Sequence, residues 1–169
     1  MNILAISGSA SERSSNYYFL NAIQTLFKGR YSIAIYDSLS DFPLFSPQRL
    51  KEGIPAIVQE FKKQVLAADA VVISTPEYSH NIPAVLKNML EWCTHSGEFS
   101  DKKVIPITFA PYEPRGEYAM QSLIFTLNAL EAKTIVQIPL YKTDVTIEDQ
   151  LIVLSEETIS FLEAAFELL

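Results

Sequence analysis

Three segments of the sequence concentrate side chains that can bind a ligand. The first, residues 7–16, reads Ser-Gly-Ser-Ala-Ser-Glu-Arg-Ser-Ser-Asn and places hydroxyl, amide and guanidinium groups directly before a helical pattern. Free N–H groups and the dipole at a helix N-terminus favour an anion. The segment lacks the glycine and lysine spacing of a nucleoside triphosphate loop and the three-glycine dinucleotide fingerprint. We therefore expect it to cradle a monophosphate, and the ordinary alternative is a solvated turn with a serine N-cap.

The second segment, residues 75–83, reads Thr-Pro-Glu-Tyr-Ser-His-Asn-Ile-Pro. Its prolines stiffen the loop, Pro83 suits the first turn of a helix, and Asn81 can cap that helix. A rigid loop with backbone donors and an aromatic side chain can hold the edge of a flat heterocycle, whereas the alternative is an ordinary connection between a strand and a helix. His80 by itself indicates neither a base nor a metal ligand, because no Asp, Glu or Cys cluster accompanies it.

The third segment, residues 109–116, reads Phe-Ala-Pro-Tyr-Glu-Pro-Arg-Gly. Tyr112 can stack on a ring and Arg115 can meet an anionic group, so the segment is a candidate pocket wall. A stiff surface turn is the alternative interpretation.

The elements that must position these segments alternate between strands and helices. Short apolar runs without polar alternation predict strands covered on both faces at residues 3–6, 33–36, 71–73, 104–109 and 134–138. Apolar residues at helical spacing predict helices within residues 17–27, 54–65, 82–93, 119–130 and 147–169. The last helix is expected to open with a capping-box spacing from Thr146 to Asp149.

This alternation predicts an α/β fold in which a five-stranded parallel sheet, in the order 2-1-3-4-5, lies between two layers of helices. Ligands of such sheets bind outside the carboxyl ends of the strands, where the strand order reverses, and the three segments follow the first, third and fourth predicted strands. Residues 38–53 read as a long loop. Pro106 lies inside an interior strand and lacks the N–H of a ladder bond, so we expect a bulge there.

Composition narrows the classes of protein that the chain can represent. Its 169 residues, 49% of them hydrophobic, suit one domain spanning residues 1–169. The single cysteine, Cys93, excludes an intramolecular disulfide and favours a reducing compartment, so we expect a cytoplasmic protein. No apolar run approaches the roughly 20 residues of a membrane span, and no basic region opens the chain. A net charge of −7 without a basic cluster argues against a nucleic-acid partner.

The first two segments resemble motifs of the NAD(P)H-dependent FMN reductase family, a flavodoxin-like group that includes quinone, azo-dye and chromate reductases. The family's phosphate loop runs Gly-Ser-x-Arg-x-x-Ser-x-Asn, and its matches here are Gly8, Ser9, Ser14 and Asn16. Ser11 stands at the arginine position, and Arg13 follows two residues later. The resemblance spans nearly the whole chain, although residues 109–116 replace a loop that is commonly glycine-rich in the family.

The family's second motif is similar to Thr-Pro-Glu-Tyr-Asn-x-Ser-x-Pro-Gly-x-Leu-Lys-Asn-x-x-Asp-Trp. This sequence matches it at residues 75–78, at Pro83, at residues 86–88 and at Trp92, with Glu91 at the aspartate position. Ser79 and Asn81 replace its Asn and Ser and keep hydrogen-bonding groups there. Lys87 and Asn88 would lie in the following helix, where a structural role is expected.

The resemblance implies that the protein binds FMN. The expected phosphate ligands are Ser9, Ser14 and Asn16, with Ser11 and Arg13 as second choices. The residues expected at the flavin ring are Pro76, Glu77, Tyr78, Ser79, Asn81, Ala110 and Tyr112, the first three through their backbone. The implied quaternary structure is a homodimer or a tetramer, with Trp92 as a candidate interface residue.

The implied activity is the transfer of electrons from NADH or NADPH through FMN to a small acceptor, such as a flavin, a quinone, an azo or nitro compound, or a metal oxyanion. Cofactors carry out this chemistry, so no catalytic side chain and no metal are expected. Two alternatives stay open. A flavodoxin-type electron carrier would bind FMN without a nicotinamide site, and a flavin-free domain would keep only the scaffold.

Overall fold

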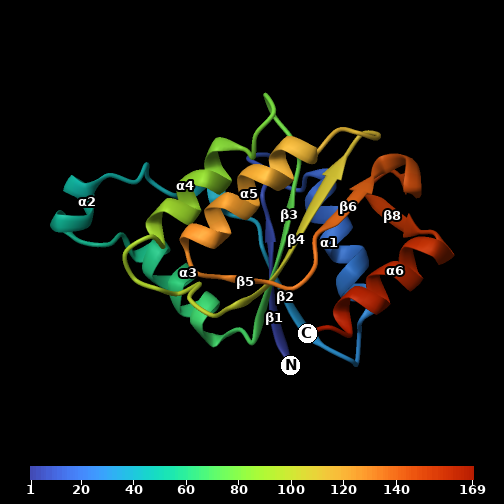
Figure 1. Ribbon diagram of the computed structural model, residues 1–169, viewed down its shortest axis with the longest axis horizontal. Helices are drawn as coiled ribbons and strands as arrows, with labels where there is room; N and C mark the ends of the chain where they lie inside the picture. The colour runs from blue at the N-terminus through green and yellow to red at the C-terminus, as the bar shows by residue number, and fades with distance from the viewer.

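A parallel sheet forms the middle layer of the computed structural model, which describes all residues from 1 to 169 (Figure 1). Its strands are β1 (Asn2–Ser7), β2 (Ser32–Tyr36), β3 (Ala70–Thr75), β4 (Lys103–Ala110), β5 (Lys133–Thr134) and β6 (Ile138–Tyr141). They pair in the order β2-β1-β3-β4-β5, and β6 pairs with β4 beyond the end of β5. The predicted α/β fold and the strand order 2-1-3-4-5 are confirmed, with the fifth strand split into two pieces.

Helices cover both faces of this sheet, which explains why the central strands are apolar on both sides (Figure 1). The helices on one face are α3 (Ala56–Ala67), α4 (Ala84–Trp92) and α5 (Glu117–Ala129), and those on the other are α1 (Ser15–Leu26) and α6 (Glu156–Phe166). Along β1, Leu4 and Ile6 join the first core cluster, whereas Ile3 and Ala5 join the second. None of these helices has the length and apolarity needed to cross a membrane.

The chain between β6 and the C-terminus is not one helix, so the prediction for residues 147–169 is wrong in its first part. Strands β7 (Val145–Glu148) and β8 (Leu151–Leu154) form an antiparallel hairpin, and Asp149 lies in its turn with φ 52°. In β8 a buried Ile152 alternates with exposed neighbours, which is the period of a strand. Helix α6 starts only after Ser155, whose hydroxyl accepts the N–H of Thr158 at 3.2 Å. The predicted cap from Thr146 to Asp149 is therefore not formed.

Residues 38–53, predicted as a loop, contain two short helical pieces. These are the 3-10 turn η1 (Leu39–Asp41) and the helix α2 (Pro47–Glu52), which projects from the body of the molecule in Figure 1. The missed signal is Ser46 followed by Pro47, because a serine cap and a proline at the first helical position mark a helix start. Asn88 anchors the chain before α2: it accepts the N–H of Phe45 at 2.7 Å, as expected of a structural residue.

Pro106 does not interrupt its own strand, and the predicted bulge lies on the neighbouring one. Strand β4 pairs with β3 without a break, with Pro106 opposite Ile73. Along the sheet edge, Val104 pairs with Thr134 but Ile107 pairs with Ile138, so three steps on β4 face four on the edge strand. The Val104 carbonyl accepts the N–H of Ile135, and Pro106, two residues on, faces the same edge. Pro106 therefore lacks its N–H on the side of the edge strand, where that strand carries its extra residue. No hydrogen bond between β4 and β3 is lost.

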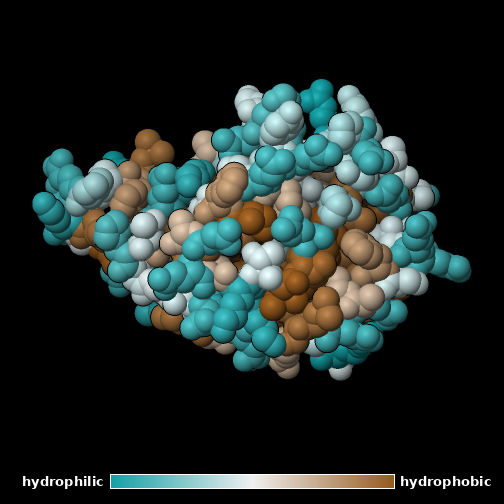
Figure 2. Space-filling model, viewed as in Figure 1, coloured by the Kyte–Doolittle hydropathy of each residue, from teal (hydrophilic) through white to brown (hydrophobic).

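The broken edge strand also leaves apolar side chains near the surface. Figure 2 shows apolar atoms gathered between α5 and α6, where the chain around Ile135 and Val136 is only partly buried.

One buried ion pair ties α3 to the loop that precedes β4. Lys62 Nζ lies 3.5 Å from Glu98 Oε1, and the two side chains are only 7% and 6% exposed. Ser96 completes the group, because its hydroxyl accepts from Lys62 Nζ and donates to Glu98 Oε2 at 2.8 Å. All three polar side chains therefore have partners, which a buried charge requires.

The Cys93 thiol lies close to this pair and should be unreactive in the folded protein. Burial, reinforced by the negative charge of Glu98 and opposed by Lys62, raises the pKa of Cys93 from 9.0 to about 12. Because the thiolate is the reactive form, we expect a disulfide reagent at pH 8 to modify Cys93 only after urea unfolds the chain. The raised folded pKa also means that this group's contribution to stability is complete below pH 9 and is lost as the pH rises from 9 towards 12. Rapid modification without urea would contradict the assignment.

Candidate functional site

The three predicted segments meet at the carboxyl edge of the sheet, the upper edge in Figure 1. Strand β1 lies between β2 and β3, and β4 follows on the far side of β3. The strand order thus reverses next to β1, which is where ligands of doubly wound sheets bind. The segments after β1, β3 and β4 are therefore neighbours in space although they are far apart in sequence.

The first segment leads into α1, and Ser14 is the N-cap of this helix. Its hydroxyl accepts the N–H of Tyr17 at 3.3 Å and lies 3.4 Å from the hydroxyl of Ser7. Ser9 is buried, and its hydroxyl accepts the N–H of Ser11 at 3.2 Å. Helix α1 has no acidic residue in its first turn, so nothing in that turn competes with a bound anion.

Gly8 brings the first segment against β3 more closely than any other residue could. Its N–H donates to the Ser74 carbonyl at 2.7 Å. A Cβ at this position would lie 2.9 Å from Leu86 Cδ2 and 3.0 Å from the Ser74 carbonyl oxygen, which is backbone and cannot rotate away. Glycine is required here because the neighbouring atoms leave no space for a side chain.

We therefore predict that Gly8→Ala displaces the first segment, residues 7–16, from β3. Overpacking of this kind costs about 1–3 kcal/mol, and the displaced loop should bind FMN more weakly. Urea unfolding and FMN titration of the same variant measure the two effects. Unchanged stability and affinity would show that the loop moves freely at Gly8.

Asn16 is buried and is partly committed to a structural bond. Its Oδ1 accepts the hydroxyl of Ser74 at 2.7 Å, which pins α1 to the end of β3. Only the amide NH₂ of Asn16 is left for a ligand. Asn16 thus lies at the predicted site, but the oxygen of its side-chain amide already accepts a hydrogen bond within the protein.

Arg13 has its backbone, and not its side chain, fixed by the fold. It adopts φ 49°, and its N–H donates to Asp37 Oδ2 at 3.1 Å. The other oxygen, Asp37 Oδ1, is buried without a partner. Sequence reasoning missed Asp37, although it directly follows the second predicted strand at the same edge. The side chains of Arg13 and Ser11 are exposed.

The second segment ends in a tight turn that presents its side chains at the surface. Tyr78 and Asn81 exchange backbone hydrogen bonds at 2.9 and 3.0 Å, and Ser79 and His80 between them have φ 51° and 56°. Two successive positive φ values are typical of a type I′ turn. Tyr78 is 53% exposed, so its ring faces solvent beside the carboxyl edge.

The Glu77 side chain caps a different helix. Its Oε2 accepts the N–H groups of Gly116, Tyr118 and Ala119 at 3.1, 3.1 and 3.2 Å. These groups form the N-terminus of α5, so the carboxylate occupies the helix start that follows the third segment. The sequence did not reveal this role, because the two elements are 39 or more residues apart.

The Glu77 carboxylate also holds the end of the third segment, through the N–H of Gly116. The two predicted site residues of this segment, Ala110 and Tyr112, lie in different environments. Ala110 is buried at the end of β4, whereas Tyr112 is 53% exposed with the Arg115 guanidinium 6.0 Å from its ring centre. Gly116, with φ 102°, packs on Thr108, where a Cβ would lie 3.0 Å from the hydroxyl oxygen. The segment is thus exposed at Tyr112, and its two ends, Ala110 and Gly116, are packed against the protein.

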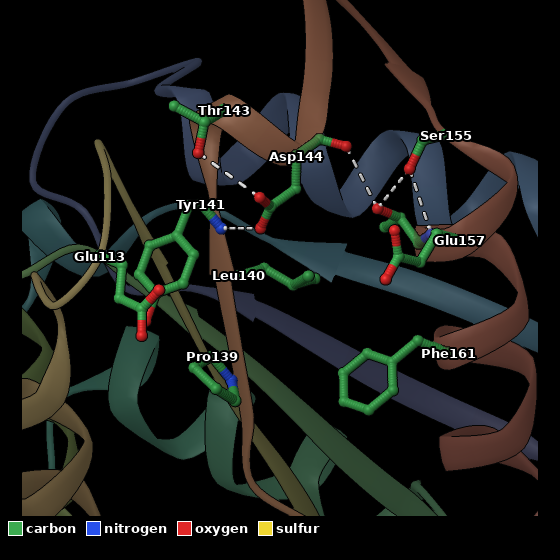
Figure 3. A pocket seen from close by; sticks show the side chains of 10 residues that line it. Glu113, Pro139, Leu140, Tyr141, Thr143, Asp144, Ser155, Glu157 and Phe161 are labelled. Carbon is green, nitrogen blue, oxygen red and sulfur yellow. Dashed lines mark hydrogen bonds between the residues drawn. The ribbon is translucent and has the colours of Figure 1, made fainter.

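A cavity of about 670 Å³ lies nearby, at the end of β6, and none of the predicted residues lines it (Figure 3). Tyr141 and Glu113 lie on one side of this cavity, and Phe161 and Glu157 lie on the other. Burial, then the negative charges of Glu113, Glu117 and Asp144, raise the pKa of Tyr141 above its ordinary value. An acidic cavity repels an anion, so this cavity does not suit a phosphate. No group of three His, Cys, Asp or Glu side chains in the chain is placed to hold a metal ion.

Comparison with known proteins decides the family. A family model described as NADPH-dependent FMN reductase matches residues 1–142. The chain belongs to this family. The family assigned from the sequence motifs is thereby confirmed.

Curated relatives of this FMN reductase family member are oxidoreductases by name. The NADH:(hydroxy)cinnamate reductase subunit CrdA of Vibrio ruber is 34% identical over 122 residues, which cover 72% of this chain and 59% of that protein. A NAD(P)H-dependent FMN reductase of Pseudomonas aeruginosa is 36% identical over 104 residues, 60% of this chain and 56% of that protein. The chain thus spans between half and three fifths of the length of these relatives.

Solved structures show the same fold. The flavoenzyme NAD(P)H:(acceptor) oxidoreductase FerB of Paracoccus denitrificans aligns with a TM-score of 0.79 at 21% identity, over 99% of this chain and 94% of that one. The apo form of the NADH:FMN oxidoreductase EMOB aligns with a TM-score of 0.74 at 18% identity, over 98% and 86%. At these identities the likeness concerns the fold, which is the flavodoxin-like arrangement expected.

The residues of this FMN reductase family member fit the cofactor that the family name implies. Gly8 packs directly on β3 and holds the segment against the sheet, and the adjacent α1 start has a serine cap and no acidic residue in its first turn. The α5 start is already satisfied by Glu77. Of these two helix starts, α1 is therefore the one left for an FMN phosphate.

Proposed function

We propose that this chain binds FMN across the segments after β1, β3 and β4 and transfers electrons from NADH or NADPH to a small acceptor. The observation that carries the proposal is the α1 N-terminus at the reversal of strand order, with Gly8 pressed onto β3 and Ser14 as its cap. The phosphate would be held by the hydroxyls of Ser9 and Ser14 and by the first N–H groups of α1, with the Asn16 amide beneath. Ser11 and Arg13 lie on the exposed side and would add weaker contacts.

The flavin ring would lie along the turn after β3. Pro76, Glu77 and Tyr78 would contact it through their backbone, with Ser79 and Asn81 beside them. Ala110 and Tyr112 would form the opposite wall. When bound, FMN supplies the redox chemistry, accepting a hydride from the nicotinamide and passing electrons to the acceptor. The protein's part is to hold the ring at a fixed place and leave one side open to both substrates.

Relatives suggest the class of acceptor. Their names include a (hydroxy)cinnamate reductase subunit, a flavin reductase subunit and quinone reductases. We propose that this chain also acts on a small conjugated acceptor, or on one of the azo, nitro or metal oxyanion compounds that its family reduces. Tyr78 and Tyr112, each 53% exposed, offer aromatic surfaces for a planar molecule.

The test is anaerobic reduction of the FMN-loaded protein by NADH and NADPH, followed by a panel of acceptors. A yellow preparation whose flavin is bleached by a nicotinamide and recovers its colour with an acceptor supports the enzyme. Bound flavin that neither nicotinamide reduces would indicate an electron carrier. A protein that binds no flavin would overturn the proposal.

We also propose one domain, a cytoplasmic location and a homodimer, which could associate further into a tetramer. The two core clusters share one sheet, and a buried free cysteine suits a reducing compartment. Trp92, the suggested interface residue, is 1% exposed and donates to the Pro43 carbonyl at 2.8 Å, so it belongs to the core. Phe125 and Tyr118 on α5, 73% and 51% exposed, are better candidates for the interface. Light scattering at micromolar concentration tests the dimer.

A further inference from the structure

The turn after β3 is fastened to α5 through side chains, and Glu77 makes the strongest of these attachments. One carboxylate oxygen receives three backbone N–H groups within 3.2 Å, at the positive end of the α5 dipole. Hydrogen bonds to a carboxylate are stronger than those between neutral groups. Without Glu77, these three donors at the helix start would lose their partner.

Two further contacts fasten the same turn to the same helix. The His80 ring stacks on the Tyr118 ring, with centres 4.4 Å apart and an angle of 21° between the planes. The Ser122 hydroxyl donates to Asn81 Oδ1 at 2.6 Å, and that oxygen also accepts the N–H of Ile82 at 2.8 Å. Residues 77–81 and the first two turns of α5 therefore form one rigid unit.

This unit joins the two walls between which the flavin ring is proposed to lie. Residues 76–78 provide one wall through their backbone, and the loop from Ala110 to Gly116, which runs directly into α5, provides the other. The Glu77 carboxylate spans the two walls, because its backbone belongs to the first and its hydrogen-bond partners begin at the end of the second. The separation of the walls therefore depends on this contact together with the two others.

We infer that Glu77 is a positioning residue that sets the site of the flavin ring, an inference that rests on the proposed function. Its carboxylate holds the walls at a fixed separation and closes the α5 N-terminus to other anions. The closed α5 start also excludes the phosphate from that helix, so the side chain that positions the ring keeps the phosphate away from α5.

Binding measurements can distinguish the role of Glu77 from that of the residues proposed to hold the phosphate. Glu77→Ala should weaken the binding of FMN and of riboflavin at least about tenfold, because displaced walls lose contacts to the ring that is common to both ligands. The visible circular dichroism of the remaining bound flavin should change as well. Glu60→Ala removes the same charge from the exposed side of α3 and should alter neither.

Addition of acetate tests the mechanism directly. A small carboxylate can take the space vacated in Glu77→Ala and accept the same N–H groups, so acetate should restore both affinities, whereas it should not affect the parent. Glu77→Gln keeps an oxygen acceptor without the charge and should lie between the parent and Glu77→Ala. This variant carries the test if Glu77→Ala does not fold.

The outcomes distinguish this inference from the proposed function. A parent protein that binds no flavin overturns the proposed function. A parent that binds flavin, with Glu77→Ala and Glu77→Gln binding FMN and riboflavin as tightly and with the same dichroism, overturns the role of Glu77. A loss limited to FMN, or a loss in Glu77→Ala that acetate does not reverse, also overturns it.

Discussion

Ser14→Asp should weaken FMN binding by at least about tenfold while leaving the fold intact. Ser14 caps α1 by accepting the Tyr17 N–H, and aspartate is an equally good N-cap, so the helix should persist. The new carboxylate would stand among the donors proposed for the phosphate, where it repels the dianion and takes up its hydrogen bonds. Charged hydrogen bonds are worth about 1.5–3 kcal/mol each, which sets the expected loss. Quenching of flavin fluorescence measures the affinity.

Riboflavin and a neutral variant provide the controls for this result. The parent should bind FMN far more tightly than riboflavin, which lacks the phosphate, and Ser14→Asp should change riboflavin binding little. Ser14→Asn also caps the helix but adds no charge, so it should retain more FMN affinity than Ser14→Asp. If Ser14→Asp binds FMN as tightly as the parent, the phosphate lies elsewhere and the assignment of residues 7–16 fails.

Glu98→Ala should lower the free energy of unfolding by about 3–5 kcal/mol. The substitution leaves Lys62, whose side chain is 7% exposed, without its counter-charge in the core, and an uncompensated buried charge has a cost of that order. The hydroxyl of Ser96 would lose its acceptor as well. Trp92 is the only tryptophan and is buried, so its fluorescence reports urea unfolding.

An exposed ion pair serves as the matched comparison. Asp101 lies 2.8 Å from Lys133, but the side chains are 79% and 62% exposed, so Asp101→Asn should cost less than about 1 kcal/mol. Asparagine also tolerates the φ of 59° at this position. The double change Lys62→Met with Glu98→Leu should recover most of the loss, because an apolar pair needs no counter-charge. Equal losses in Glu98→Ala and Asp101→Asn would show that burial adds nothing to the pair.

The sequence alone predicted the central strands and the layers, because their cause is local. Residues 3–6 and 71–73 are unbroken apolar runs, which only a strand covered on both faces accommodates, and the intervening helical periodicity determines how the chain must cross. The same reasoning failed for residues 147–154. An apolar run that short is compatible with a strand or a helix, and its packing against α1 decided for the hairpin.

The split of the fifth strand was likewise beyond the reach of local patterns. The position of Pro106 was recognised as a conflict in the ladder, but the sequence does not say which neighbour an N–H would face. Only the pairing of β4 with both β3 and the edge shows that the bulge belongs to residues 135–137. The register of a neighbouring strand is a tertiary property.

For the site, the sequence by itself predicted a phosphate cradle at residues 7–16 and a ring-holding turn after the third strand, and it determined that the two segments meet at one edge of a parallel sheet. The tertiary structure decided which atoms are free. In the folded chain Asn16 Oδ1 accepts the Ser74 hydroxyl, the Glu77 carboxylate accepts N–H groups of the α5 N-terminus, and Asp37 accepts the Arg13 N–H. These partners are 24 to 58 residues apart, so no local period encodes them, and a polar group's availability to a ligand depends on what the fold has already bonded to it.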